Sequence, residues 1–76
     1  MTCMNTNQKY AMLRSTLLEA RLKEDLTQKE LAKKLNKHQS FVSKYENGER
    51  NIDVIELIEI CCFLNISPLD IIEKIK

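Results

Sequence analysis

A short polar stretch carries side chains that could hydrogen-bond to the edges of nucleic-acid bases. Four of them recur at spacings that place them on one face of a predicted helix: Gln39, Ser40, Ser43 and Lys44. The amide of Gln39 can donate to and accept from adenine together, and the ammonium of Lys44 can donate to guanine. Most polar helix faces are only solvated, so this pattern alone leaves both interpretations open.

Two short helices must position that face. Thr27 and Glu30 have the spacing of a capping box, which predicts a helix start, and Asn36 tolerates the left-handed conformation that ends helices. A second short helix is predicted over residues 38–46, and Gly48 stops it because glycine accepts a positive φ. A turn of about three residues between two such helices is typical of a helix-turn-helix, whose second helix lies in the major groove of DNA.

Three further segments have apolar residues at helical spacing. They run from Lys9 to about Lys23, from Val54 to Leu64, and onward from Pro68. The fourth of the five helices is expected to bury Val54, Leu57, Ile60, Cys61 and Leu64. One Gly and one Pro in 76 residues argue against a turn-rich sandwich or barrel. The sequence therefore predicts an all-α fold, a compact five-helix domain over residues 9–76, preceded by a flexible tail over residues 1–8.

The composition is that of a globular domain, and the total charge says little about its partners. Hydrophobic residues are 43% and charged residues 30%, as in an ordinary globular domain, and the net charge of +1 does not by itself indicate a nucleic-acid partner. The charge is nevertheless polarised. Residues 29–50 hold six Lys or Arg against three Glu, whereas residues 51–76 hold two Lys against five acids.

The sequence shows neither a membrane-spanning segment nor a set of residues that could form a catalytic or metal site. No apolar run is long enough for a membrane span, and no secretory signal is visible, so we expect a cytoplasmic protein without a membrane partner. Three cysteines, two of them adjacent, form neither a disulfide framework nor a metal-ligand spacing. We find no nucleophile–base constellation, no metal cluster and no phosphate-cradling loop. The sequence thus predicts no catalytic residues, no metal, no cofactor, no evident small-molecule ligand and no enzyme activity.

The chain resembles a family of bacterial regulators, the lambda-repressor-like helix-turn-helix family, also called the xenobiotic-response-element (XRE) family. The resemblance covers about residues 10–72 and rests on Leu26-Thr27-Gln28, Leu31-Ala32, Val42-Ser43, Glu46-Asn47-Gly48, and the apolar pattern of Leu57, Ile60-Cys61, Leu64 and Ile66. It implies a transcriptional regulator that binds double-stranded DNA sequence-specifically.

The resemblance also implies roles for single residues. The base-reading positions are Gln39, Ser40 and Lys44. The positions expected to contact the DNA backbone are Gln28, Lys37, Ser43, Asn47 and Arg50. Arg21 and Glu46 match a structural ion pair that fixes the recognition helix.

Several nearby residues have a structural interpretation that we prefer, or one that stays open. His38 is expected to start its helix, and Lys33 and Lys34 to lie on a solvated face. Phe41 stands where smaller residues are frequent. It either touches a thymine methyl or the sugar-phosphate backbone, or it only covers the core.

The last third of the chain has more apolar residues than so small a core needs. The candidates for a dimer interface are Ile58, Cys62, Leu69, Ile72 and Ile75. We expect a homodimer on a near-palindromic operator, although some of these residues could simply be core. The alternative is a protein-interaction module, such as an antitoxin or adaptor, that uses the same fold.

Overall fold

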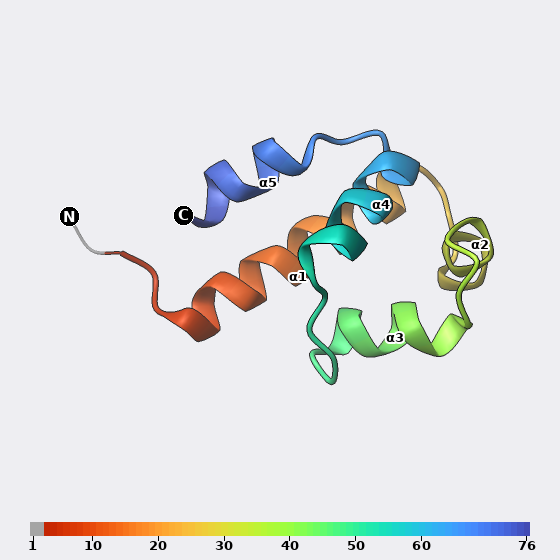
Figure 1. Ribbon diagram of the computed structural model, residues 1–76, viewed down its shortest axis with the longest axis horizontal. Coiled ribbons are helices and arrows are strands. Elements are labelled where there is room, and N and C mark those ends of the chain that lie inside the picture. Colours follow the sequence, from red (N-terminus) through yellow and green to blue (C-terminus); the bar gives the residue numbers. More distant parts are fainter. Residues whose placement is uncertain (1–2) are drawn as a thin grey trace.

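Residues 3–76, described by a computed structural model, form a bundle of five helices (Figure 1). The helices are α1 (Thr6–Lys23), α2 (Gln28–Lys34), α3 (Gln39–Asn47), α4 (Val54–Leu64) and α5 (Pro68–Ile75). No strand occurs in this part of the chain. The predicted all-α, five-helix fold is confirmed.

The first helix starts earlier than predicted. Asn5 is its N-cap and forms a capping box with Gln8: Asn5 Oδ1 accepts from the Gln8 amide at 2.8 Å, and Gln8 Oε1 accepts from the Asn5 amide at 2.9 Å. The helix therefore begins at Thr6 rather than Lys9, and the prediction of a tail through residue 8 is wrong for residues 6–8. Met1 and Thr2, the start of the predicted tail, lie outside the described residues.

Side chains next to the other helices also fix where they begin and end. Thr27 and Asp53 form capping boxes at the starts of α2 and α4, as Glu30 and Glu56 return a hydrogen bond to each cap. Three of the turns contain an Asx residue with φ of 57°, at Asp25, Asn36 and Asn65. These residue types visit the left-handed region most easily after glycine, which explains why the chain can turn sharply there.

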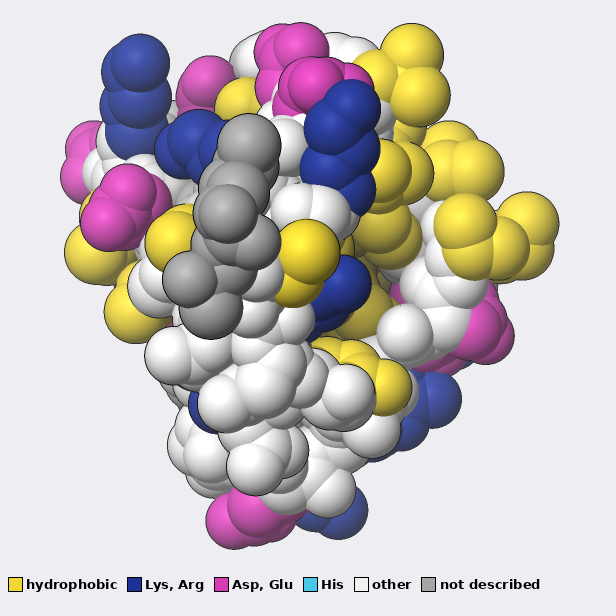
Figure 2. Space-filling model, turned by 90° about the vertical axis from the view of Figure 1, so that its left-hand side faces the viewer, with side chains coloured by type: hydrophobic (Ala, Val, Ile, Leu, Met, Phe, Trp, Pro, Cys, Tyr) yellow, Lys and Arg dark blue, Asp and Glu magenta, His cyan; other side chains and the backbone are white. Residues whose placement is uncertain are grey.

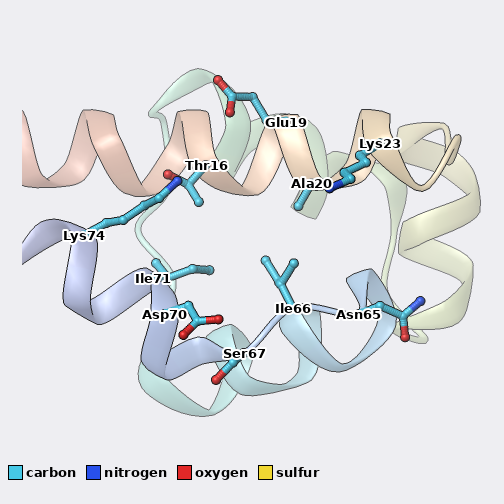
Figure 3. A pocket seen from close by; sticks show the side chains of 10 residues that line it. All are labelled: Thr16, Glu19, Ala20, Lys23, Asn65, Ile66, Ser67, Asp70, Ile71 and Lys74. Carbon is cyan, nitrogen blue, oxygen red and sulfur yellow. The ribbon is translucent and has the colours of Figure 1, made fainter.

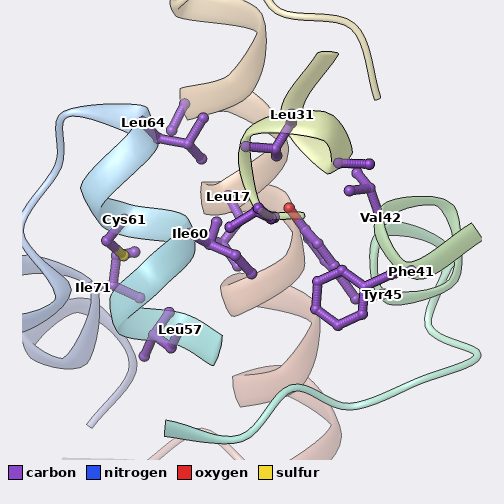
Figure 4. Close-up of a cluster of buried hydrophobic side chains, with 13 residues drawn as sticks. Leu17, Leu31, Phe41, Val42, Tyr45, Leu57, Ile60, Cys61, Leu64 and Ile71 are labelled. Atoms are coloured by element: carbon purple, nitrogen blue, oxygen red, sulfur yellow. The ribbon is translucent and has the colours of Figure 1, made fainter. Parts of the chain in front are cut away.

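The core lies between α1 and three of the other helices. Helix α1 packs against α3, α4 and α5, and α2 packs mainly against α3. Figure 4 shows Leu17 of α1, Tyr45 of α3 and Ile60 of α4 pointing into this common interior, where each is at most 2% exposed. Val54 was expected to join them, but it is 62% exposed, because the first residue of α4 lies at the edge of the bundle.

The arrangement separates two surfaces. Helices α2 and α3 lie together at one side of the bundle, and α4 and α5 lie on another (Figure 1). Among the described helices, none is both long and apolar enough to cross a membrane.

Candidate nucleic-acid interface

Helix α3 is held at both ends by local contacts. At its start, Nδ1 of His38 accepts a hydrogen bond from the Ser40 amide at 3.2 Å, so His38 is the N-cap. At its end, Gly48 adopts φ of +87°. A Cβ atom there would lie 3.3 Å from Cζ of Arg14 on α1, a tight contact that the flexible end of the arginine could relieve by a small shift, so it is the positive φ that favours glycine.

One face of α3 is buried and the other is open. Phe41, Val42 and Tyr45 are buried in the core. The predicted base-reading residues are all exposed and share the opposite face with two predicted backbone contacts: Gln39, Ser40, Ser43, Lys44 and Asn47. At 100° per residue these positions span an arc of about 140°. The structure therefore brings the predicted base-reading side chains together on one outward surface.

These outward side chains differ in how freely they can reach a ligand. Within residues 3–76, the side chains of Gln39 and Lys44 make no hydrogen bond or ion pair. The hydroxyl of Ser40 lies 3.1 Å from His38 Nδ1. Oδ1 of Asn47 accepts from the Glu49 amide at 3.0 Å, which leaves its predicted backbone contact dependent on a local turn. Gln39 and Lys44 are thus the most available groups on this face.

A buried ion pair fixes α3 against the rest of the domain. Nε of Arg21 donates to Oε2 of Glu46 at 2.7 Å, and Nη2 of Arg21 donates to Oε1 at 3.1 Å. The two side chains are only 10% and 6% exposed. The remaining terminal nitrogen, Nη1, donates to the carbonyl of Leu26 at 2.7 Å. This network ties the end of α1, the turn after it and the end of α3 into one unit.

Gln28 belongs to the same network. Its Nε2 donates to Oε1 of Glu46 at 2.8 Å, across 18 residues of sequence. The predicted phosphate contact at Gln28 therefore cannot use a freely moving side chain. One amide hydrogen and the backbone N–H at the first position of α2 remain as donors.

Phe41 covers the core and carries two cations on its ring. The ring is buried and meets Tyr45 edge-on, with centroids 5.5 Å apart. The ammonium of Lys37 lies 5.3 Å from the ring centroid, and the guanidinium of Arg50 lies 4.7 Å from it. Of the two interpretations left open for Phe41, the structure favours the covering of the core.

Arg50 is neutralised within the protein. Its two terminal nitrogens donate to the carboxylate of Glu56 at 3.1 and 3.0 Å. This bond lowers the pKa of Glu56 and raises that of Arg50. The role of Arg50 as a DNA-backbone contact stays a prediction, and Glu56 competes for its charge. The sequence analysis did not predict this pair. Its only local signal was that Arg50 comes three residues before Asp53, the N-cap of a helix that has Glu56 in its first turn.

The predicted dimer candidates lie mostly on the surface. Leu69 is 72% exposed, Ile58, Cys62 and Ile72 are also exposed, and Ile75 is half-buried beside the start of α1. Val54 and Ile55 add to the same exposed apolar set. Figure 2 shows hydrophobic side chains gathered on the upper right of the molecule, on the side of α4 and α5. This surface is separate from the polar face of α3.

Comparisons with known proteins agree with this geometry. A helix-turn-helix family model matches residues 17–71. An XRE-family like protein from Pseudomonas syringae pv. tomato str. DC3000 is 46% identical, with a TM-score of 0.85 over 91% of this chain and 84% of that one. The chain belongs to the XRE-like helix-turn-helix family. Family membership makes it a DNA-binding transcription regulator rather than an enzyme, as the sequence predicted.

More distant structures of the same fold include two restriction-modification controller proteins. C.AhdI from Aeromonas hydrophila is 26% identical, with a TM-score of 0.75 over 82% of this chain and 94% of that one. C.Esp1396I, as a tetramer in complex with its natural 35 base-pair operator, is 25% identical, with a TM-score of 0.76 over 88% of each chain. The comparison with curated proteins found no match.

Proposed function

We propose that this regulator binds a near-palindromic operator as a homodimer and reads base edges with Gln39, Ser40 and Lys44. The observation that carries the proposal is the outward polar face of α3, which the buried pair of Arg21 and Glu46 holds in one orientation. A rigid helix with unengaged amide and ammonium groups suits direct readout in the major groove, because base discrimination needs fixed donors.

The net charge supports a dimer. A chain with a net charge of +1 gains little affinity from phosphate neutralisation alone, so two copies on one operator would offset this weakness. The exposed apolar residues of α4 and α5 supply a surface for the second copy. A twofold dimer would place its recognition helices about 34 Å apart, one turn of DNA.

Selection of bound duplexes from a random pool tests base reading. We expect a defined half-site, and we expect Lys44→Ala to lose about 1–3 kcal/mol at one base position only. Lys74→Ala on α5 removes the same charge far from α3 and should leave the preference unchanged. Equal weakening on every sequence by Lys44→Ala would contradict a base-reading role.

Sedimentation of variants tests the dimer. Ile58→Asp should shift the chain to monomer and weaken binding to the full operator while sparing a single half-site. Leu22→Asp on α1, where Leu22 is 60% exposed but outside α4 and α5, serves as the control. A wild-type chain that stays monomeric and binds no duplex would instead favour the protein-interaction module.

A further inference from the structure

The surface between α2 and the start of α3 is hollowed. A recess of about 440 Å³ is lined by Lys29, Ala32, Lys33, Asn36, Lys37, His38 and Gln39. Lys29 and Lys33 are four residues apart on α2 and therefore face the same side. Ala32 lies beside them and is only 2% exposed, so its small side chain leaves room for the hollow.

The side chains that line this recess carry positive charge only, although Lys37 also helps to lower the pKa of Glu56, which lies outside the recess. Three lysines line it and no acidic residue does. Within residues 3–76, none of the three has a carboxylate within ion-pair distance. The one acid of α2, Glu30, is turned to the helix start, where its carboxylate accepts from the Thr27 amide at 2.9 Å. That bond lowers the pKa of Glu30, which holds the carboxylate in its capping role.

A second hollow of similar size shows that such charge is not general on this protein. The hollow between α1 and α5, about 400 Å³, is lined by two acids and two lysines (Figure 3): Glu19, Asp70, Lys23 and Lys74. Its charges balance, and it lies away from α3. The recess beside α2 is therefore distinguished by its sign as well as by its place.

We propose that the recess formed by Lys29, Lys33 and Lys37 binds a DNA backbone phosphate outside the base pairs that α3 reads. The recess shares Gln39 with the base-reading face, so it adjoins the surface that α3 would present to DNA. Lys37 lines the recess, and its ammonium lies 5.3 Å from the centroid of the Phe41 ring. Three close cations repel one another, and a phosphate relieves that repulsion. This inference rests on the proposed function. It extends the predicted backbone contacts beyond Lys37, and it gives Lys33 a phosphate contact where the sequence favoured a solvated face.

The salt dependence of DNA affinity measures the proposal. Each neutralised phosphate contributes about 0.9 to the slope of log affinity against log salt, or about eightfold in affinity at 0.1 M salt relative to 1 M. On an operator from the selection experiment, Lys29→Ala/Lys33→Ala should lower the slope by about 1 and weaken binding about eightfold at 0.1 M salt. The control Lys23→Ala/Lys34→Ala removes two exposed charges that do not line the recess, and it should change binding less than twofold.

Duplex length gives a second readout. The wild type should lose the same factor when the duplex is cut back to the outer base pairs of the half-sites, because the outer phosphates are then missing. The variant Lys29→Ala/Lys33→Ala should not respond to this trimming. Lys29→Arg/Lys33→Arg keeps the charges and should restore both the slope and the response to length.

The outcomes separate this inference from the proposed function. If no duplex is selected, the proposed function fails and this inference fails with it. If an operator is found but both double-alanine variants show the same slope and length response, only the recess assignment is overturned. Saturable binding of inorganic phosphate to the free wild type, combined with an unchanged DNA slope in Lys29→Ala/Lys33→Ala, would also overturn it in favour of a free-anion site.

Discussion

The buried pair of Arg21 and Glu46 gives the sharpest prediction. In Glu46→Leu, the guanidinium of Arg21 keeps its charge at 10% exposure but loses both bonds to the carboxylate. Removing one partner of a buried pair costs about 3–5 kcal/mol, because the remaining charge is uncompensated. A chain of 76 residues has a typical unfolding free energy of about 4–11 kcal/mol. We therefore expect the single variant to be marginally folded at 25 °C.

Removing both charges should be far less damaging. Well-packed apolar replacements of a buried pair are often neutral, because they avoid the cost of desolvating two ions. Arg21→Met/Glu46→Leu should therefore recover most of the stability lost in Glu46→Leu. It leaves only the Gln28 amide and the Leu26 carbonyl without their partners. DNA affinity should recover less than stability, because the position of α3 is no longer fixed by directional bonds.

Urea unfolding followed by circular dichroism measures the four corners of this double-mutant cycle. Arg50→Met is the control, since Arg50 is 42% exposed in its pair with Glu56, and exposed pairs contribute about 0–1 kcal/mol. The reasoning is refuted if Glu46→Leu costs no more than Arg50→Met. It is also refuted if the double variant shows the full sum of the two single losses.

Three further predictions follow from buried or paired groups. The hydroxyl of Tyr45 is buried without a hydrogen-bond partner among the described residues. Because such a group costs free energy in the folded state, Tyr45→Phe should stabilise the fold by about 1–3 kcal/mol. A lower urea midpoint for the variant would contradict this. Arg50 lowers the pKa of Glu56, so the pair stabilises the fold above the ordinary glutamate pKa, and this stability is lost as the pH falls through the lowered pKa. Glu56→Gln should therefore reduce the loss of unfolding free energy that urea titrations measure between about pH 5 and 2. An unchanged dependence of the unfolding free energy on pH would exclude the pair as its cause. Burial raises the pKa of Cys61 to about 11, so iodoacetamide at pH 8 should label exposed Cys3, which lies outside α4 and α5, and should spare Cys61 until urea unfolds the chain. Equal labelling of Cys3 and Cys61 in mass spectra of the native protein would show that α4 opens readily.

Local signals predicted the framework of this protein well. The Thr27–Glu30 capping box and Gly48 lie within one turn of the helix ends that they fix, so their effect can be read without knowing the fold. The same kind of signal was present at the first helix, where Asn5 caps α1, but the polar composition of residues 1–8 concealed it. The prediction that Val54 is buried is wrong for a different reason: its apolar side chain suits a core, but it is the first residue of α4 and lies exposed.

The sequence by itself determined the five helices, the spacing of the helix-turn-helix and the polar face of α3, because helix periodicity and capping act over three or four residues. Only the tertiary structure decided which charges remain free for a ligand. Gln28 is drawn to Glu46 and Arg50 to Glu56, while Lys29 and Lys33 keep no carboxylate partner within residues 3–76. Those outcomes depend on angstrom-scale distances between separate elements, and such distances are set by how the helices pack rather than by the order of residues along the chain.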